Sequence, residues 1–139
     1  MPADAEPYPW NALLGRLVGL RLFSVQFVLD HVQLRFDGPE LDEPVLTCVV
    51  MPAVEAAGRR TAPGGAGYAD ALVSLVAGTV LETAEAAGRG LRIDLTSGRV
   101  VVDPRREDLV GPEIALLTGF RDGGWGCWRP GEDAFDHLA

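Results

Sequence analysis

The stretch LRLFSVQFVLDHVQLRFDG, residues 20–38, decides the fold class that we expect. In its second half Val32, Leu34 and Phe36 alternate strictly with polar residues, which places the apolar side chains on one face of a strand. Its first half is rich in β-branched and aromatic residues, and Asp30-His31 stands where a tight turn should join the two strands. The stretch therefore predicts a β-hairpin with one buried face and one solvated face.

A second stretch, LVAGTVLETAEAAGRGLRIDLTSG at residues 75–98, has the same order of features. When Gly19 is aligned with Gly78, the alternating residues of the first hairpin coincide with Leu91, Ile93 and Leu95. This similarity predicts two pseudo-repeated halves at about 13–52 and 72–104, each built as helix, strand, strand, strand, with a C-terminal element at 105–139. A chance likeness between two half-buried hairpins is the alternative to duplication.

Neither half could bury its sheet face alone, so the two sheets must meet each other or a shared helix layer. The expected fold class is therefore α+β, with antiparallel β-hairpins in two pseudo-repeated halves (helix-strand-strand-strand) and one or two short helices packed on the sheet.

Apolar periodicity and turn residues predict the other elements. Helices are expected at 10–17 and 68–77, strands at 45–51, 79–86 and 125–128, and a mobile linker at 53–67. Residues 113–120 fit a helix or a strand equally well. Residues 1–9 carry three prolines and predict a disordered arm before a single domain at 10–139, on which Phe135 and Leu138 should pack.

The composition excludes several kinds of chemistry. The net charge is −8, which opposes binding to a nucleic acid and favours cationic partners. All 12 basic residues are Arg, so a lysine Schiff base, a Walker A lysine and a Ser-Lys dyad are excluded. The scarcity of residues with AT-rich codons indicates a gene from a high-GC bacterium. We expect no membrane-spanning segment, no signal peptide, and a cytoplasmic location with two unpaired cysteines.

Three motifs carry a resemblance to known proteins. The first is a hairpin running from Gly19 through Asp30 to Phe36, the second is GLRIDLTSGRVVVDP at 90–104, and the third is an apolar segment at 113–120 followed by WGCWRPGED at 125–133. Their order resembles a small, uncharacterised family of α+β domains that is common in actinobacteria. Glu132 departs from that pattern, which has a second Gly there. Members of such families sometimes accompany toxin systems, so the resemblance implies an immunity-like role and no catalytic residues.

Few residues have the pattern of a reaction centre. Cys48 stands within an apolar strand and is interpreted as core packing. Cys127 lies between two tryptophans and fits either packing or a reactive thiol. His31 next to Asp30 fits either a general base or a solvated turn residue. No spacing of His, Cys or acidic residues matches a metal site, so we predict no cofactor and no metal.

Two functions are compatible with these observations. The first is a non-enzymatic, acidic protein–protein interaction domain, such as an immunity-type or accessory protein of a bacterial system, whose partner is a cationic protein or a second copy in a homodimer. Its contact residues would be acidic and aromatic, and the candidates are Asp42, Glu43, Trp125, Trp128, Glu132 and Asp133. The alternative is a small enzyme or small-molecule-binding domain with a pocket between the two halves, in which Asp30 and His31 would act.

Overall fold

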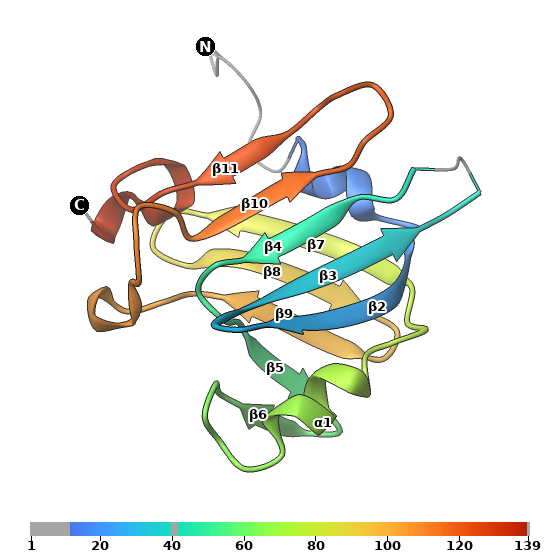
Figure 1. Cartoon of the computed structure of the whole chain (residues 1–139), viewed down its shortest axis with the longest axis horizontal. Helices are drawn as coiled ribbons and strands as arrows, with labels where there is room; N and C mark the ends of the chain where they lie inside the picture. Colours follow the sequence, from blue (N-terminus) through green and yellow to red (C-terminus); the bar gives the residue numbers. More distant parts are fainter. Residues whose placement is uncertain (1–11, 40–41, 139) are drawn as a thin grey trace.

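Two antiparallel sheets of five strands face each other across one apolar core in the computed structural model, which describes residues 12–39 and 42–138 (Figure 1). Sheet 1 has the strand order β11-β10-β4-β3-β2, and its strands are β2 (Arg21–Val28), β3 (His31–Asp37), β4 (Val45–Cys48), β10 (Ala115–Thr118) and β11 (Gly126–Trp128). Sheet 2 has the order β6-β5-β9-β8-β7, and its strands are β5 (Ala53–Ala56), β6 (Arg59–Thr61), β7 (Val80–Ala86), β8 (Gly90–Leu95) and β9 (Gly98–Val102).

The alternating residues of the two hairpins build the core between the sheets. Val32, Leu34 and Phe36 of β3 are 1% exposed or less, and Leu91 and Ile93 of β8 are equally buried. Because side chains along a strand point to opposite faces in turn, the polar residues between them face outward. The prediction of two hairpins with one buried face each is confirmed.

Each sheet combines a three-stranded meander with a hairpin from elsewhere in the chain. The β5–β6 hairpin, which follows β4 in sequence, pairs with β9 of sheet 2. The β10–β11 hairpin, which follows β9, pairs with β4 of sheet 1. The segment after residue 105 therefore supplies two strands of sheet 1 and is part of the main architecture.

The two sheets join at one corner, where the start of β2 meets the start of β7. Arg21 and Thr79 form an isolated antiparallel bridge there. Four backbone hydrogen bonds flank it: Gly19 N to Val80 O, Ala77 N to Leu22 O, Leu22 N to Gly78 O, and Val80 N to Leu20 O. Beyond this corner the two strands diverge, and each becomes an edge of its own sheet.

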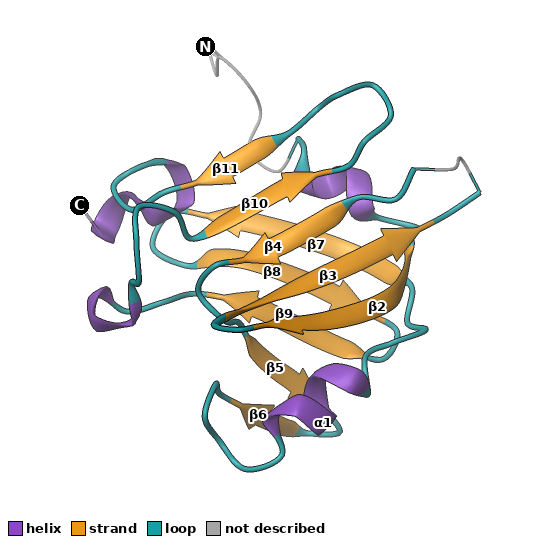
Figure 2. Ribbon diagram, in the orientation of Figure 1, coloured by secondary structure: helices purple, strands orange, loops and turns teal. Residues whose placement is uncertain are grey.

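Helices contribute less than expected, so the protein is mostly β (Figure 2). The α-helix α1 spans only Tyr68–Val73, and the others are the 3-10 helices η1 (Leu14–Leu17), η2 (Arg106–Asp108) and η3 (Asp133–Leu138). The apolar periodicity at 68–77 was a correct signal for burial, because Leu72 and Leu75 are fully buried. Its length was overestimated because the chain leaves the helix after Val73, and Ala77 takes a φ of 81° that no α-helix allows.

The prediction of a mobile linker at 53–67 is wrong for its first part, where β5 and β6 form a hairpin. Val54 is fully buried, and Ala57-Gly58 provides a two-residue turn with positive φ angles of 53° and 76°. Alanine and arginine have little strand preference, so the strands arise here from pairing with β9. The strand expected at 45–51 ends at Cys48, and the expected arm at 1–9 lies outside the described residues.

Other expectations near the C-terminus are met. The ambiguous segment 113–120 contains strand β10, and the strand expected at 125–128 is β11. Phe135 and Leu138 are buried against the body, with exposed fractions of 0% and 8%. Within the part of the chain that the structure describes, no helix has the length and apolar character needed to cross a membrane.

Candidate functional site

The acidic and aromatic residues predicted as contacts fall into two separate groups. Asp42 accepts a hydrogen bond from the Arg121 amide at 2.8 Å, beside the loop that leads from β10 into β11. Glu132 and Asp133 follow the opposite end of β11. The predicted acidic residues therefore lie near the two ends of β11.

The two tryptophans line a small hollow beside β11. Trp125 is 65% exposed, whereas Trp128 is buried and its indole Nε1 donates a hydrogen bond of 2.7 Å to Oε1 of Glu85. The hollow has a volume of about 290 Å³, and Asp133 also contributes to its wall. The structure thus brings Trp125, Trp128 and Asp133 together, with Glu85 as a neighbour that the sequence did not single out.

The pair proposed for acid–base chemistry lies at a hairpin turn. Nδ1 of His31 is 3.3 Å from Oδ1 of Asp30, and the Asp30 side chain is 76% exposed. Asp30 also borders a hollow of about 470 Å³ between the segments that follow β4 and β9, but His31 does not line it. The His31 side chain is 27% exposed, so the pair lies at the rim of the surface, and its role as a base stays a prediction.

The cysteines lack the properties of nucleophiles. Burial raises the pKa of the Cys48 thiol to about 12, because the thiolate would lose its hydration. Burial also raises the pKa of Cys127, which is half-buried on β11. No group of three or more His, Cys, Asp or Glu side chains within residues 12–39 and 42–138 is arranged to hold a metal ion.

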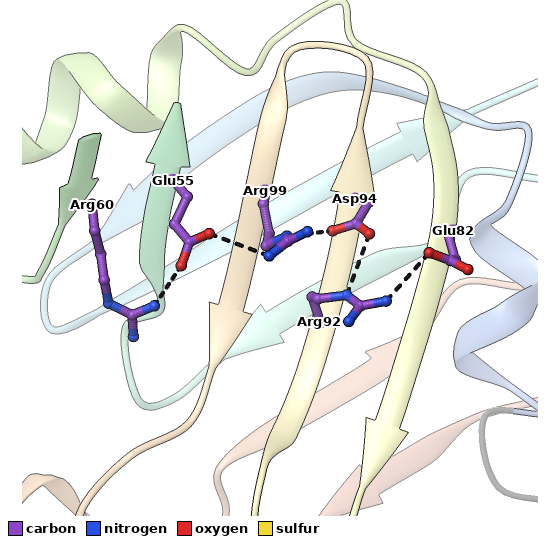
Figure 3. Close-up of polar contacts among 6 residues, drawn as sticks. All are labelled: Glu55, Arg60, Glu82, Arg92, Asp94 and Arg99. Atoms are coloured by element: carbon purple, nitrogen blue, oxygen red, sulfur yellow. Dashed lines mark hydrogen bonds and ion pairs between the residues drawn. The ribbon is translucent and has the colours of Figure 1, made fainter. Parts of the chain in front are cut away.

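The outer face of sheet 2 carries a row of paired charges (Figure 3). The row crosses five strands in register and consists of Glu82, Asp94, Arg99, Glu55 and Arg60. Arg99 is 2.6 Å from Asp94 and 3.4 Å from Glu55, and Arg60 is 2.6 Å from Glu55. Arg92 joins the row through Asp94 and Glu82, both at 3.3 Å. We call these six residues the charge ladder. Its three cations and three anions form ion pairs with one another on a solvated surface.

The outer face of sheet 1 is different in kind. Two registered rows of outward side chains cross it: Ser24, Arg35, Val45 and Thr118, and then Gln26, Gln33, Thr47, Leu116 and Cys127. We call these nine residues the neutral face. Arg35 is its one charged member, and the Arg21–Asp37 ion pair lies beyond it at the end of β2 and β3. Arg35 donates to Gln33 at 3.2 Å, has no carboxylate partner in the described chain, and keeps its buried Nε without a hydrogen bond.

The edge of the neutral face is strand β2, which exposes apolar side chains. Phe27 is 46% exposed, Val28 40% and Leu29 99%. Leu29 also has a φ of 49°, a left-handed conformation that is unfavourable for a leucine. Sequence reasoning missed this edge, although three consecutive apolar residues before a turn break the one-sided alternation of a half-buried strand.

Comparison with known proteins gives no further assignment. No family model, no curated protein and no solved structure matches this chain. The resemblance to the actinobacterial domains therefore stays a prediction, and the function must be argued from these surfaces.

Proposed function

We propose that this protein is a non-enzymatic protein–protein interaction domain that contacts its partner with the neutral face of sheet 1. The observation that carries the proposal is the contrast between the two outer faces. In a chain of net charge −8, eight of the nine side chains on the neutral face are uncharged, whereas the equivalent surface of sheet 2 is a charge ladder. Depletion of charge distinguishes the centre of an interface from ordinary surface.

Arg35 strengthens this assignment. A guanidinium that is partly buried and has no carboxylate partner loses hydration without a compensating ion pair. A partner carboxylate or backbone carbonyl at the neutral face would supply the missing acceptor. Arginine is also one of the residues enriched where interfaces bind tightly.

The acidic charge has a separate role in the proposal, which is to attract a cationic partner over longer distances. Several exposed carboxylates have no ion pair or hydrogen bond in the described chain: Glu43, Asp70, Asp103, Glu132, Asp133 and Asp136. They belong to loops and helical turns around the body. A diffuse negative field accelerates encounter with a positive protein, while the neutral face forms the contact itself. An immunity-type or accessory role in a bacterial system is compatible with this arrangement.

A site-specific photo-crosslinker at Thr47 tests the proposal in the native host cell. Thr47 lies on β4, the middle strand of sheet 1, and points outward half-buried. The matched control is Val101, which points outward half-buried from β9, the middle strand of sheet 2. We expect adducts with a different protein from Thr47 and none from Val101. Equal adducts from both positions, or adducts from Val101 alone, would contradict the proposal.

We also infer that the two halves arose by duplication, with their last hairpins exchanged between the sheets. The four hydrogen bonds at the corner support this. If residues 19–22 and residues 77–80 exchange places, each of the four bonds coincides with another of the four. Gly19 then corresponds to Ala77, one position before the Gly78 of the sequence alignment, and both have positive φ angles, of 90° and 81°. Each half also has a register shift at the same place, between Leu22 and Ser24 in β2 and between Val80 and Glu82 in β7.

The exchange of hairpins has a consequence that can be measured. If the chain is cut in the turn between Thr61 and Tyr68, each fragment lacks a hairpin that its own sheet needs. We expect each fragment to be unfolded alone and an equimolar mixture to recover the β-sheet circular dichroism of the intact chain. A fragment that folds on its own would count against exchanged halves.

A further inference from the structure

The four sheet edges differ in how they are protected. Strands β6 and β11 have three residues each, and β6 carries Arg59 and Arg60. Strand β7 is packed against η1 and η3. Strand β2 has eight residues, forms the lower margin of the front sheet in Figure 1, and has β3 as its main neighbour. Short length, charge, bulges and covering segments are the usual protections of an edge, and β2 has none of them after Ser24, since its one register shift lies between Leu22 and Ser24.

We propose that β2 pairs in antiparallel orientation with β2 of a second copy of this chain, which joins two copies of sheet 1 into one continuous sheet. The inference concerns the edge of sheet 1 and goes beyond the partner proposed for its outer face. It commits to a second copy because the edge is complementary to itself in backbone, in apolar side chains and in charge.

The backbone of β2 offers free groups at regular intervals. The Phe36 amide donates to Pro44, so the even-numbered residues of β3 direct their backbone groups toward β4. Their partners on β2, Val25 and Phe27, must therefore direct their N–H and C=O groups away from β3. No other described segment bonds these groups.

One register satisfies these groups symmetrically. If Val25 of one copy faces Phe27 of the other, Gln26 lies on the two-fold axis and the two strands exchange four N–H···O=C bonds. No charged residue lies between Leu22 and Leu29, so pairing brings no like charges together. An antiparallel strand pair of about six residues has the usual length in globular proteins.

The ends of the paired strands are also complementary. In this register Asp30 of one copy lies near Arg21 of the other, and this occurs twice. Arg21 stands at the corner, where its backbone pairs with Thr79 and its guanidinium binds Asp37, so Asp30 would share that guanidinium. Both side chains are accessible, with exposed fractions of 58% and 76%. Leu29, the exposed apolar residue at the hairpin tip, faces Phe23 of the second copy, which is 37% exposed. The pairing therefore covers the apolar side chains that the monomer leaves in water.

Disulfide crosslinking tests the register in a Cys127→Ser background, where the remaining Cys48 is buried. Gln26→Cys should give a covalent dimer on mild oxidation, because the two side chains would face each other across the axis. Ser24→Cys alone should not, since its nearest counterpart is Val28 of the second copy. The double variant Ser24→Cys/Val28→Cys should crosslink again. Equal crosslinking of Ser24→Cys and Gln26→Cys would overturn the register and with it the proposed pairing.

Measurement of mass in solution tests the pairing without engineered thiols. We expect the unmodified protein to have twice the chain mass of 14.8 kDa at high concentration in sedimentation equilibrium. Phe27→Pro should have the mass of one chain, because it removes an outward N–H without removing a bond to β3. The control Phe27→Val keeps that N–H and should stay dimeric. A monomeric unmodified protein, or a dimer that Phe27→Pro leaves intact, would overturn the proposal.

Discussion

Substitution of Gly90 by alanine should destabilise the protein strongly, for two reasons that the structure separates. Gly90 opens β8 with a φ of 75°, a left-handed conformation that costs alanine about 1–2 kcal/mol. A Cβ at this position would also overlap the carbonyl oxygen of Val102 on the paired strand β9 and press on the ring of Phe135. Separating β8 from β9 to relieve such an overlap costs about 1–3 kcal/mol more. The expected loss is about 2–5 kcal/mol, a large part of the stability of a typical domain.

Gly88→Ala is the matched control, because only the conformational effect applies at Gly88. Its φ is 76°, almost the same as that of Gly90, but a Cβ there would meet no atom within 4 Å. Gly88→Ala should therefore lose only the conformational part, about 1–2 kcal/mol. Urea unfolding followed by tryptophan fluorescence, with the buried Trp128 as reporter, measures both variants. If Gly90→Ala is no less stable than Gly88→Ala, the argument from close approach of β9 is refuted.

Three further measurements test the core and the charge ladder. Tyr68→Phe removes a buried hydrogen bond to the Pro52 carbonyl and should lower the free energy of unfolding by about 1 kcal/mol; an unchanged urea midpoint would contradict this. Asp94→Asn should lower the urea midpoint at low salt, and the difference should shrink at high salt, because Asp94 links two arginines in the ladder; a difference that does not depend on salt would mean that the ion pairs do not stabilise the fold. The Cys48 thiol has a pKa of 9.0 in the unfolded chain and about 12 in the folded one, so well below pH 9.0 it is protonated in both and adds no pH dependence. Between these values the thiol ionises in the unfolded chain alone, so the free energy of unfolding should fall by up to about 1.4 kcal/mol per pH unit. Cys48→Ala should make the decline in urea midpoints less steep.

Local patterns in the sequence were sufficient where one strand has one buried face. Val32, Leu34 and Phe36 were predicted inside because strict alternation has a single structural meaning. The β5–β6 hairpin could not be found in this way, since only Val54 is fully buried there and the strands depend on pairing with β9. Contacts between segments far apart in the chain leave little trace in either segment.

The candidate surfaces show the same division. Arg35 and Asp94 are both outward residues of central strands, and each has an opposite charge two positions away, Asp37 and Arg92. Pairing of β8 with β9 places Asp94 beside Arg99, whereas pairing of β3 with β4 places Arg35 beside Val45. The contrast between the charge ladder and the neutral face is therefore a property of strand register.

The sequence by itself determined the β2–β3 and β8–β9 hairpins, their buried faces, and the absence of lysine chemistry, because each depends on residue identity and on spacing within about twenty positions. The tertiary structure alone decided which hairpin joins which sheet, which charges meet, and which edge stays unpaired. These outcomes follow from the pairing of backbone groups between remote strands. Every strand presents the same N–H and C=O groups whatever its side chains, so partners are chosen by how the whole core closes.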